Sequence, residues 1–131
     1  MINYVNIAFG TDDGINFTSN HFGEAKFYLI YKLNLDNNEI ELIEERNNNS
    51  ISEEIHGDPK KAKSISELLK DISVLVGYVM GPNIVRIKKK FVVVISREKN
   101  IKESIEKIKK EKNKIKSELE KEGDKDIIYI Q

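Results

Sequence analysis

Hydrophobic residues in this chain gather in short runs separated by polar segments marked by glycine and asparagine. The apolar, β-rich runs predict strands at residues 4–9, 25–33, 40–43, 72–77 and 91–95. Most of these runs are nearly continuously apolar, which is typical of strands covered on both faces. In the third run Glu39 and Glu41 alternate with Ile40 and Leu42, which predicts one wet face and a position at the edge of a sheet.

Helical patterns occupy the second half of the chain. Asp58-Pro59 is a helix start, with an acidic N-cap and proline at the first position, and the helix is predicted to run to about Lys70. A short second helix is predicted from Pro82. A long third helix is predicted from the capping pattern at Asn100 to Gly123. Residues 127–130 are either a last short edge strand or a loosely attached tail.

The order of these elements is strand-strand-strand-helix-strand-helix-strand-helix. The Asp36-Asn37-Asn38 turn makes the second and third strands a hairpin, and the strand–helix–strand crossovers are right-handed. The pattern predicts a mixed five-stranded sheet, order 3-2-1-4-5 in chain numbering, with strand 2 antiparallel and helices on both faces. This is a ribonuclease H-like three-layer α/β/α fold. We expect one domain over 1–131, with its core at about 2–122 and a C-terminal tail at 123–131.

Composition excludes several classes of function. The 131 residues contain 22 Lys+Arg and 22 Asp+Glu, and this balance argues against nucleic acid as a partner. No cysteine is present, which excludes disulfides and thiolate metal sites. No apolar run approaches the ~20 residues of a membrane span, and the N-terminus enters a strand directly without a signal-peptide pattern. We therefore expect a cytoplasmic protein with no membrane partner.

The predicted topology brings the chemically interesting loops to one edge of the sheet. Ligands of such sheets bind beyond the carboxyl ends of parallel strands where the strand order reverses, here between strands 1 and 4. Loop 10–24 follows strand 1, loop 77–81 follows strand 4, and the segment with His56 and the strand-5 end with Arg97 reach the same edge. The candidate site residues are Asp13, His21, Phe22, Gly23, His56, Gly77, Met80, Gly81 and Arg97.

Each candidate also has a structural interpretation. Asp12-Asp13-Gly14 is a turn pattern, and His56 is placed to support the following helix cap. Loop 77–81 suits an anion because N–H groups gather at a helix N-terminus, whereas Met80 is also an ordinary packing residue. A ribonuclease H-type nuclease needs carboxylates on neighbouring central strands. Strand 4 ends in Val76-Gly77 and does not supply one, so we expect no enzyme.

The quoted segments together resemble a known family. The segments that carry the resemblance are Ile7–Gly14, His21–Ala25, Phe27–Tyr31, His56–Pro59, Val74–Gly77 and Met80–Asn83. They resemble the dinitrogenase iron–molybdenum cofactor biosynthesis family, the NifX-like proteins and the domain appended to NifB, over about residues 4–110. The resemblance implies the same ribonuclease H-like fold and binding or carriage of an iron–molybdenum cofactor or its iron–sulfur precursor. It also implies that His21 is the cofactor contact.

The leading hypothesis is therefore a non-enzymatic carrier of a metal–sulfur cofactor, with His21 as the metal ligand and cofactor-assembly proteins as partners. Because cysteine is absent, the cluster would arrive preformed and be held by His21, His56 and backbone N–H groups, with Arg97 suited to its negative charge. The alternative is a small-ligand or protein-interaction module of the same fold with no metal role. A monomer is expected, or a weak homodimer paired through strand 3 or residues 127–130.

Overall fold

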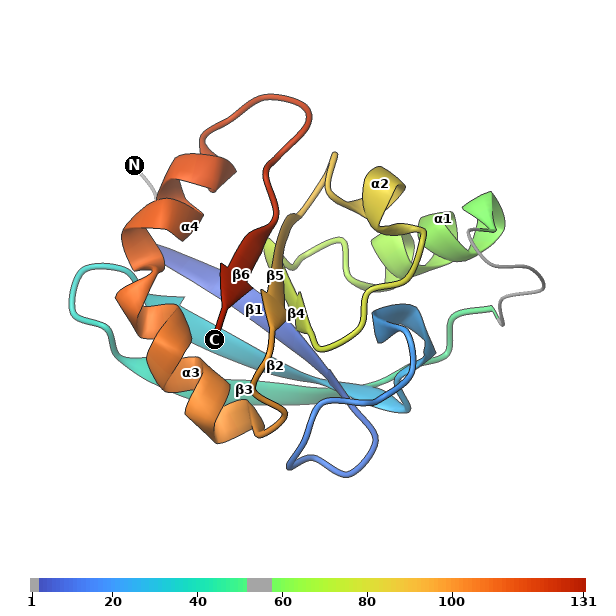
Figure 1. Ribbon diagram of the computed structural model, residues 1–131, viewed down its shortest axis with the longest axis horizontal. Helices are drawn as coiled ribbons and strands as arrows, with labels where there is room; N and C mark the ends of the chain where they lie inside the picture. Colours follow the sequence, from blue (N-terminus) through green and yellow to red (C-terminus); the bar gives the residue numbers. More distant parts are fainter. Residues whose placement is uncertain (1–2, 52–57) are drawn as a thin grey trace.

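The computed structural model describes residues 3–51 and 58–131 of the chain, and these residues form a six-stranded sheet (Figure 1). The strand order is β3-β2-β1-β4-β5-β6. The β1/β2 and β2/β3 pairs are antiparallel, and the β1/β4, β4/β5 and β5/β6 pairs are parallel. The strands are β1 (Tyr4–Thr11), β2 (Phe27–Asn34), β3 (Ile40–Asn47), β4 (Val74–Gly77), β5 (Val92–Ser96) and β6 (Ile128–Ile130). The predicted order 3-2-1-4-5 is confirmed, with a sixth strand added beside β5.

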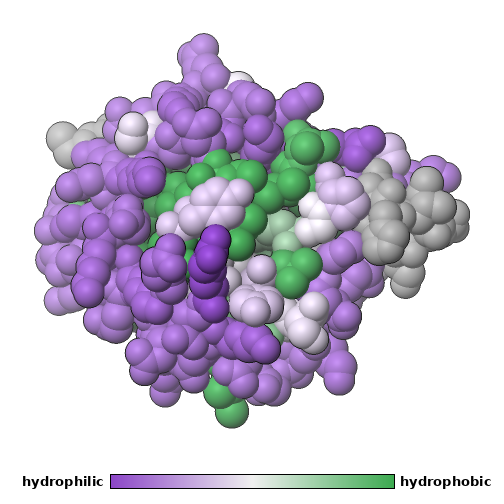
Figure 2. Space-filling model, in the orientation of Figure 1, coloured by the Kyte–Doolittle hydropathy of each residue, from purple (hydrophilic) through white to green (hydrophobic). Residues whose placement is uncertain are grey.

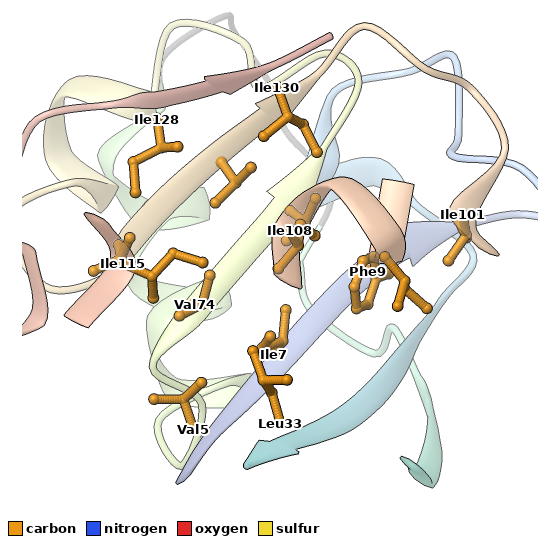
Figure 3. Close-up of a cluster of buried hydrophobic side chains, with 14 of the residues drawn as sticks. Val5, Ile7, Phe9, Leu33, Val74, Ile101, Ile108, Ile115, Ile128 and Ile130 are labelled. Carbon is orange, nitrogen blue, oxygen red and sulfur yellow. The ribbon is translucent and has the colours of Figure 1, made fainter. Parts of the chain in front are cut away.

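Helices cover both faces of this sheet, as the three-layer prediction requires. They are the single 3₁₀ turn η1 (Phe22–Glu24), α1 (Pro59–Leu68), α2 (Ile84–Ile87), α3 (Ile101–Lys110) and α4 (Lys112–Leu119). On one face α3 and α4 bury Ile108 and Ile115 against Ile7 and Val74 of the sheet (Figure 3). On the other face α1, α2 and η1 cover a second cluster that contains Phe22.

The predicted third helix is two helices. Glu111 ends α3 and begins α4, with φ −102° and ψ 14°. The apolar stripe of Ile101, Ile105 and Ile108 has no member again until Ile115, so no buried side chain holds the helix straight through Glu111. The break falls at this gap in the stripe.

Two other boundaries differ from the sequence prediction. The second helix begins at Ile84, because Pro82 and Asn83 form a turn before it. Strand β3 extends to Asn47 and contains a bulge, since Ile30 lies opposite Glu44 and the next residue of β2 lies opposite Leu42. The expected burial of its apolar face was wrong, because Leu42 is 46% exposed.

Candidate functional site

The His21-Phe22-Gly23 segment forms the η1 turn, which lies near the carboxyl ends of β1 and β4. The backbone N–H of Phe22 donates to the carbonyl of Val79 at 2.8 Å, which ties the turn to the loop after β4. The Tyr28 hydroxyl donates to the Phe22 carbonyl at 2.8 Å. The side-chain amide of Asn48 donates to the Gly23 carbonyl at 2.8 Å. Segments distant in the sequence thus fix this turn.

Phe22 anchors the turn in the core. Its side chain is fully buried, and its ring lies 4.9 Å from that of Tyr28. A Cβ at Gly10 would lie 3.1 Å from the Phe22 ring, and one at Gly77 would lie 3.2 Å from it. The absence of a side chain at both glycines therefore leaves room for the Phe22 ring. The structure places Gly77 beneath Phe22, as a buried residue.

His21 lies directly on Gly81. Gly81 has φ +79°, and a Cβ there would lie only 2.7 Å from Cγ and Nδ1 of the imidazole. Glycine is therefore required both for the backbone conformation and for the contact. His21 itself is half-buried. His21 and Gly81 come from two different loops, which the predicted topology placed at the same edge of the sheet. The structure brings them into contact.

A small cavity lies beside this contact. It is lined in part by His21, Lys61, Met80 and Asn83, and its volume is about 10 Å³. A water molecule needs about 10–15 Å³. This cavity is too small for a cofactor. Met80 is buried and lines this cavity.

Lys61 is a buried cation next to the turn, and it is not among the candidates predicted from the sequence. Its Nζ lies 3.3 Å from the Glu24 carboxylate and donates to the Ser50 hydroxyl at 2.8 Å and to the Ile51 carbonyl at 2.6 Å. Only 4% of Lys61 is exposed. The available signal was its spacing, because Lys61 lies four residues before the buried Ile65 on one face of α1.

Burial changes the acidity of one side chain that holds the turn, Tyr28. Burial raises the pKa of the Tyr28 hydroxyl, and the negative charge of Glu24 adds to that rise. Tyr28 therefore stays protonated and acts as a hydrogen-bond donor to the backbone. It holds the turn in place.

Asp13 serves its own turn. Its carboxylate accepts the backbone N–H groups of Ile15 and Asn16, each at 2.8 Å, and these bonds hold the pKa of Asp13 below its usual value. The neighbouring Asp12 accepts the Thr18 hydroxyl at 2.9 Å. This network matches the turn interpretation of the Asp-Asp-Gly pattern.

Arg97, a further candidate, is not part of the cavity at His21. It is exposed after β5, where its backbone N–H donates to the Ile130 carbonyl at 3.0 Å. His56 lies outside the described residues. Within residues 3–51 and 58–131, no group of three or more His, Cys, Asp or Glu side chains is placed to hold a metal ion. None of the helices described there is long and apolar enough to cross a membrane.

The fold and this turn define a ribonuclease H-like α/β domain with a histidine held at the switch point of the sheet. Residues 4–111 match the family model described as dinitrogenase iron-molybdenum cofactor. The chain belongs to this family, as the resemblance indicated. Domains of the family are generally non-catalytic proteins of cofactor assembly. A search of curated proteins finds no match.

Proposed function

We propose that this protein binds or carries an iron–molybdenum cofactor or an iron–sulfur precursor of it, without catalysing a reaction, and that His21 is the metal ligand. The observation that carries the proposal is the placement of His21. Its half-buried imidazole is held on Gly81 by a turn that Phe22 anchors in the core. A ligand fixed in this way loses little freedom when it binds its cargo.

The chemistry of the turn supports a preformed, surface-held cargo. A neutral imidazole is a suitable ligand for iron and related metals. The cavity behind His21 holds less than a cofactor needs, so the cargo would stay at the outer edge of the ring. In this arrangement Phe22 and Gly77 support the η1 turn, whereas Asp13 stabilises the separate turn at residues 12–14. His21, with the backbone of Gly23 and Gly81 beside it, is the contact surface.

The test is an anaerobic titration of isolated iron–molybdenum cofactor, and separately of an iron–sulfur precursor cluster, into the wild type, His21→Ala and Asn20→Ala. Asn20 is the matched control, because it is the exposed neighbour of His21 in the same loop. Binding is followed by visible absorption and by metal analysis of the protein peak after gel filtration. Loss of a residue that only hydrogen-bonds to a metal ligand typically weakens metal binding about 10–100-fold, so loss of the ligand itself is expected to weaken binding at least about tenfold. Asn20→Ala is expected to bind like the wild type.

Equal affinity of the wild type and His21→Ala would remove His21 from the site. Failure of all three proteins to bind either cargo would favour the alternative, a small-ligand or protein-interaction module of the same fold. Metal analysis of the protein purified from its native host then separates the two functions, since a reproducible absence of iron and molybdenum supports the module without metal.

A further inference from the structure

The two edges of the sheet are built differently. Strand β3 is exposed along its length, carries Glu41, Glu44 and Glu45, and contains a bulge. Charges and bulges at an edge discourage pairing with another chain. At the opposite edge, β6 lies in the segment Ile127–Gln131, which contains no charge, proline or glycine. The β6 edge therefore lacks the protection that the β3 edge has.

Hydrophobic surface gathers around β6. Figure 2 shows it over β6, β5 and α2, in the middle of the face seen in Figure 1. Tyr129 of β6 is 56% exposed and Val85 of α2 is 54% exposed. Ile95 of β5 and Ile84 of α2 are half-buried beside them. Helix α2 is a single turn, so it leaves the outer two strands partly uncovered on this face.

The backbone of Tyr129 is directed to this open edge. The Arg97 N–H donates to the Ile130 carbonyl, so the peptide groups of Ile130 face β5. Because backbone groups alternate along a strand, the N–H and C=O of Tyr129 point away from β5. A single residue at the centre of β6 thus offers both a donor and an acceptor to an added strand.

We propose that β6 pairs with β6 of a second copy of this chain, antiparallel, about a two-fold axis at Tyr129. The two Tyr129 residues exchange both backbone hydrogen bonds, as directly opposed residues do in an antiparallel ladder. Ile128 of one copy lies opposite Ile130 of the other, which extends the apolar layer beneath α3 and α4. The two sheets become one continuous sheet.

The charges beside β6 are complementary in this arrangement and favour a second copy as the partner. Asp126 precedes the strand and its side chain is 85% exposed, although it also contacts Lys121 at 3.1 Å. Arg97 is exposed at the other end of the strand, next to Ile130. Antiparallel pairing brings the acidic end of each copy toward the basic end of the other, whereas parallel pairing would bring like charges together.

Disulfide trapping tests this geometry directly, because the natural chain has no cysteine. Directly opposed residues of a hydrogen-bonded antiparallel pair have Cα atoms about 5.5 Å apart, within disulfide range. Tyr129→Cys is expected to form a covalent dimer under mild oxidation. Leu42→Cys, at an exposed position on the β3 edge, is the matched control and is expected to stay monomeric. A Leu42→Cys dimer without a Tyr129→Cys dimer would overturn the proposal.

Analytical ultracentrifugation of the full chain supplies the equilibrium test. Tyr129→Lys is expected to raise the dimer dissociation constant at least about a hundredfold, because it brings like charges together at the axis. Arg97→Asp and Asp126→Arg are each expected to weaken the dimer, and their combination to restore it. A wild-type protein that stays monomeric at its highest soluble concentration, including one that instead pairs only with a different protein, would overturn the proposal.

Discussion

The contact between His21 and Gly81 can be measured by adding a single methyl group. In Gly81→Ala the new Cβ would lie 2.7 Å from the imidazole, so His21 or the loop has to move. The substitution also places alanine at φ +79°, a left-handed conformation that costs an L-residue about 1–2 kcal/mol. Overpacking typically adds about 1–3 kcal/mol. We expect Gly81→Ala to lower the free energy of unfolding by about 2–5 kcal/mol.

Gly123 provides a matched control for the backbone contribution. It has φ +80°, almost the value of Gly81, but a Cβ there would meet nothing within 4 Å. Gly123→Ala therefore reports conformational strain alone, and we expect a loss of about 1–2 kcal/mol. The difference between the two glycine substitutions is the free energy of the clash with His21.

A double-mutant cycle completes the measurement. With His21→Ala in place, Gly81→Ala is expected to cost no more than Gly123→Ala, because the ring that it would meet is gone. Urea unfolding followed by circular dichroism measures all the variants, since single domains of this size usually unfold in one cooperative step. If Gly81→Ala costs the same with and without His21, the imidazole does not rest on Gly81 and our description of the turn is wrong.

Other substitutions test the anchoring of the turn and the surface network. Phe22→Ala is expected to cost about 3–5 kcal/mol in urea unfolding, since it empties a fully buried site. Tyr28→Phe is expected to cost about 0.5–1.5 kcal/mol, because the Phe22 carbonyl loses the hydroxyl donor and keeps only the N–H of Ala25. Hydrogen bonds from Arg46 hold the pKa values of Glu44 and Asp71 below their usual values in the folded state. The stability that they contribute is present above the unfolded-state pKa of about 4 and is lost as the pH falls through the folded-state values. Asp71→Asn is expected to lower the free energy of unfolding at neutral pH by up to about 1 kcal/mol, with the gap from wild type closing below about pH 4 in urea titrations.

The strand order was predictable because it follows from local signals. The turn at Asp36-Asn37-Asn38 specifies the hairpin, and right-handed strand–helix–strand crossovers place the later strands on the other side of the first strand. The division at Glu111 was harder to predict, because lysine and glutamate residues with good helix propensity continue on both sides of it. The extension of β3 to Asn47 also depends on tertiary structure. Arg46 pairs with Asp71 at 2.7 Å, a residue 25 positions away, and no local pattern predicts that contact.

The meeting of two loops beside His21 was predictable from topology, whereas the contacts of individual residues were not. Topology placed the loop with His21 beside the loop with Gly81, and the structure joins them. The buried state of Gly77 follows from the space that Phe22 needs, which is a three-dimensional property. The burial of Lys61 could not be predicted from the sequence, because a lysine at the start of a helix is usually solvated. Here its ammonium group is buried because Glu24, Ser50 and a carbonyl surround it.

The proposed dimer leaves the proposed cargo site open in both copies. In the sheet β6 is three positions from β1, a distance of roughly 14 Å at the usual strand spacing. The η1 turn lies near the carboxyl ends of β1 and β4, and antiparallel pairing of β6 directs those ends to opposite sides of the two-fold axis. The two His21 residues would then face separate regions of solvent, and each copy would receive its cargo independently. Loss of the dimer in Tyr129→Lys would therefore leave the cargo affinity per chain unchanged. Cargo binding at His21 and dimerisation through β6 can thus be tested independently.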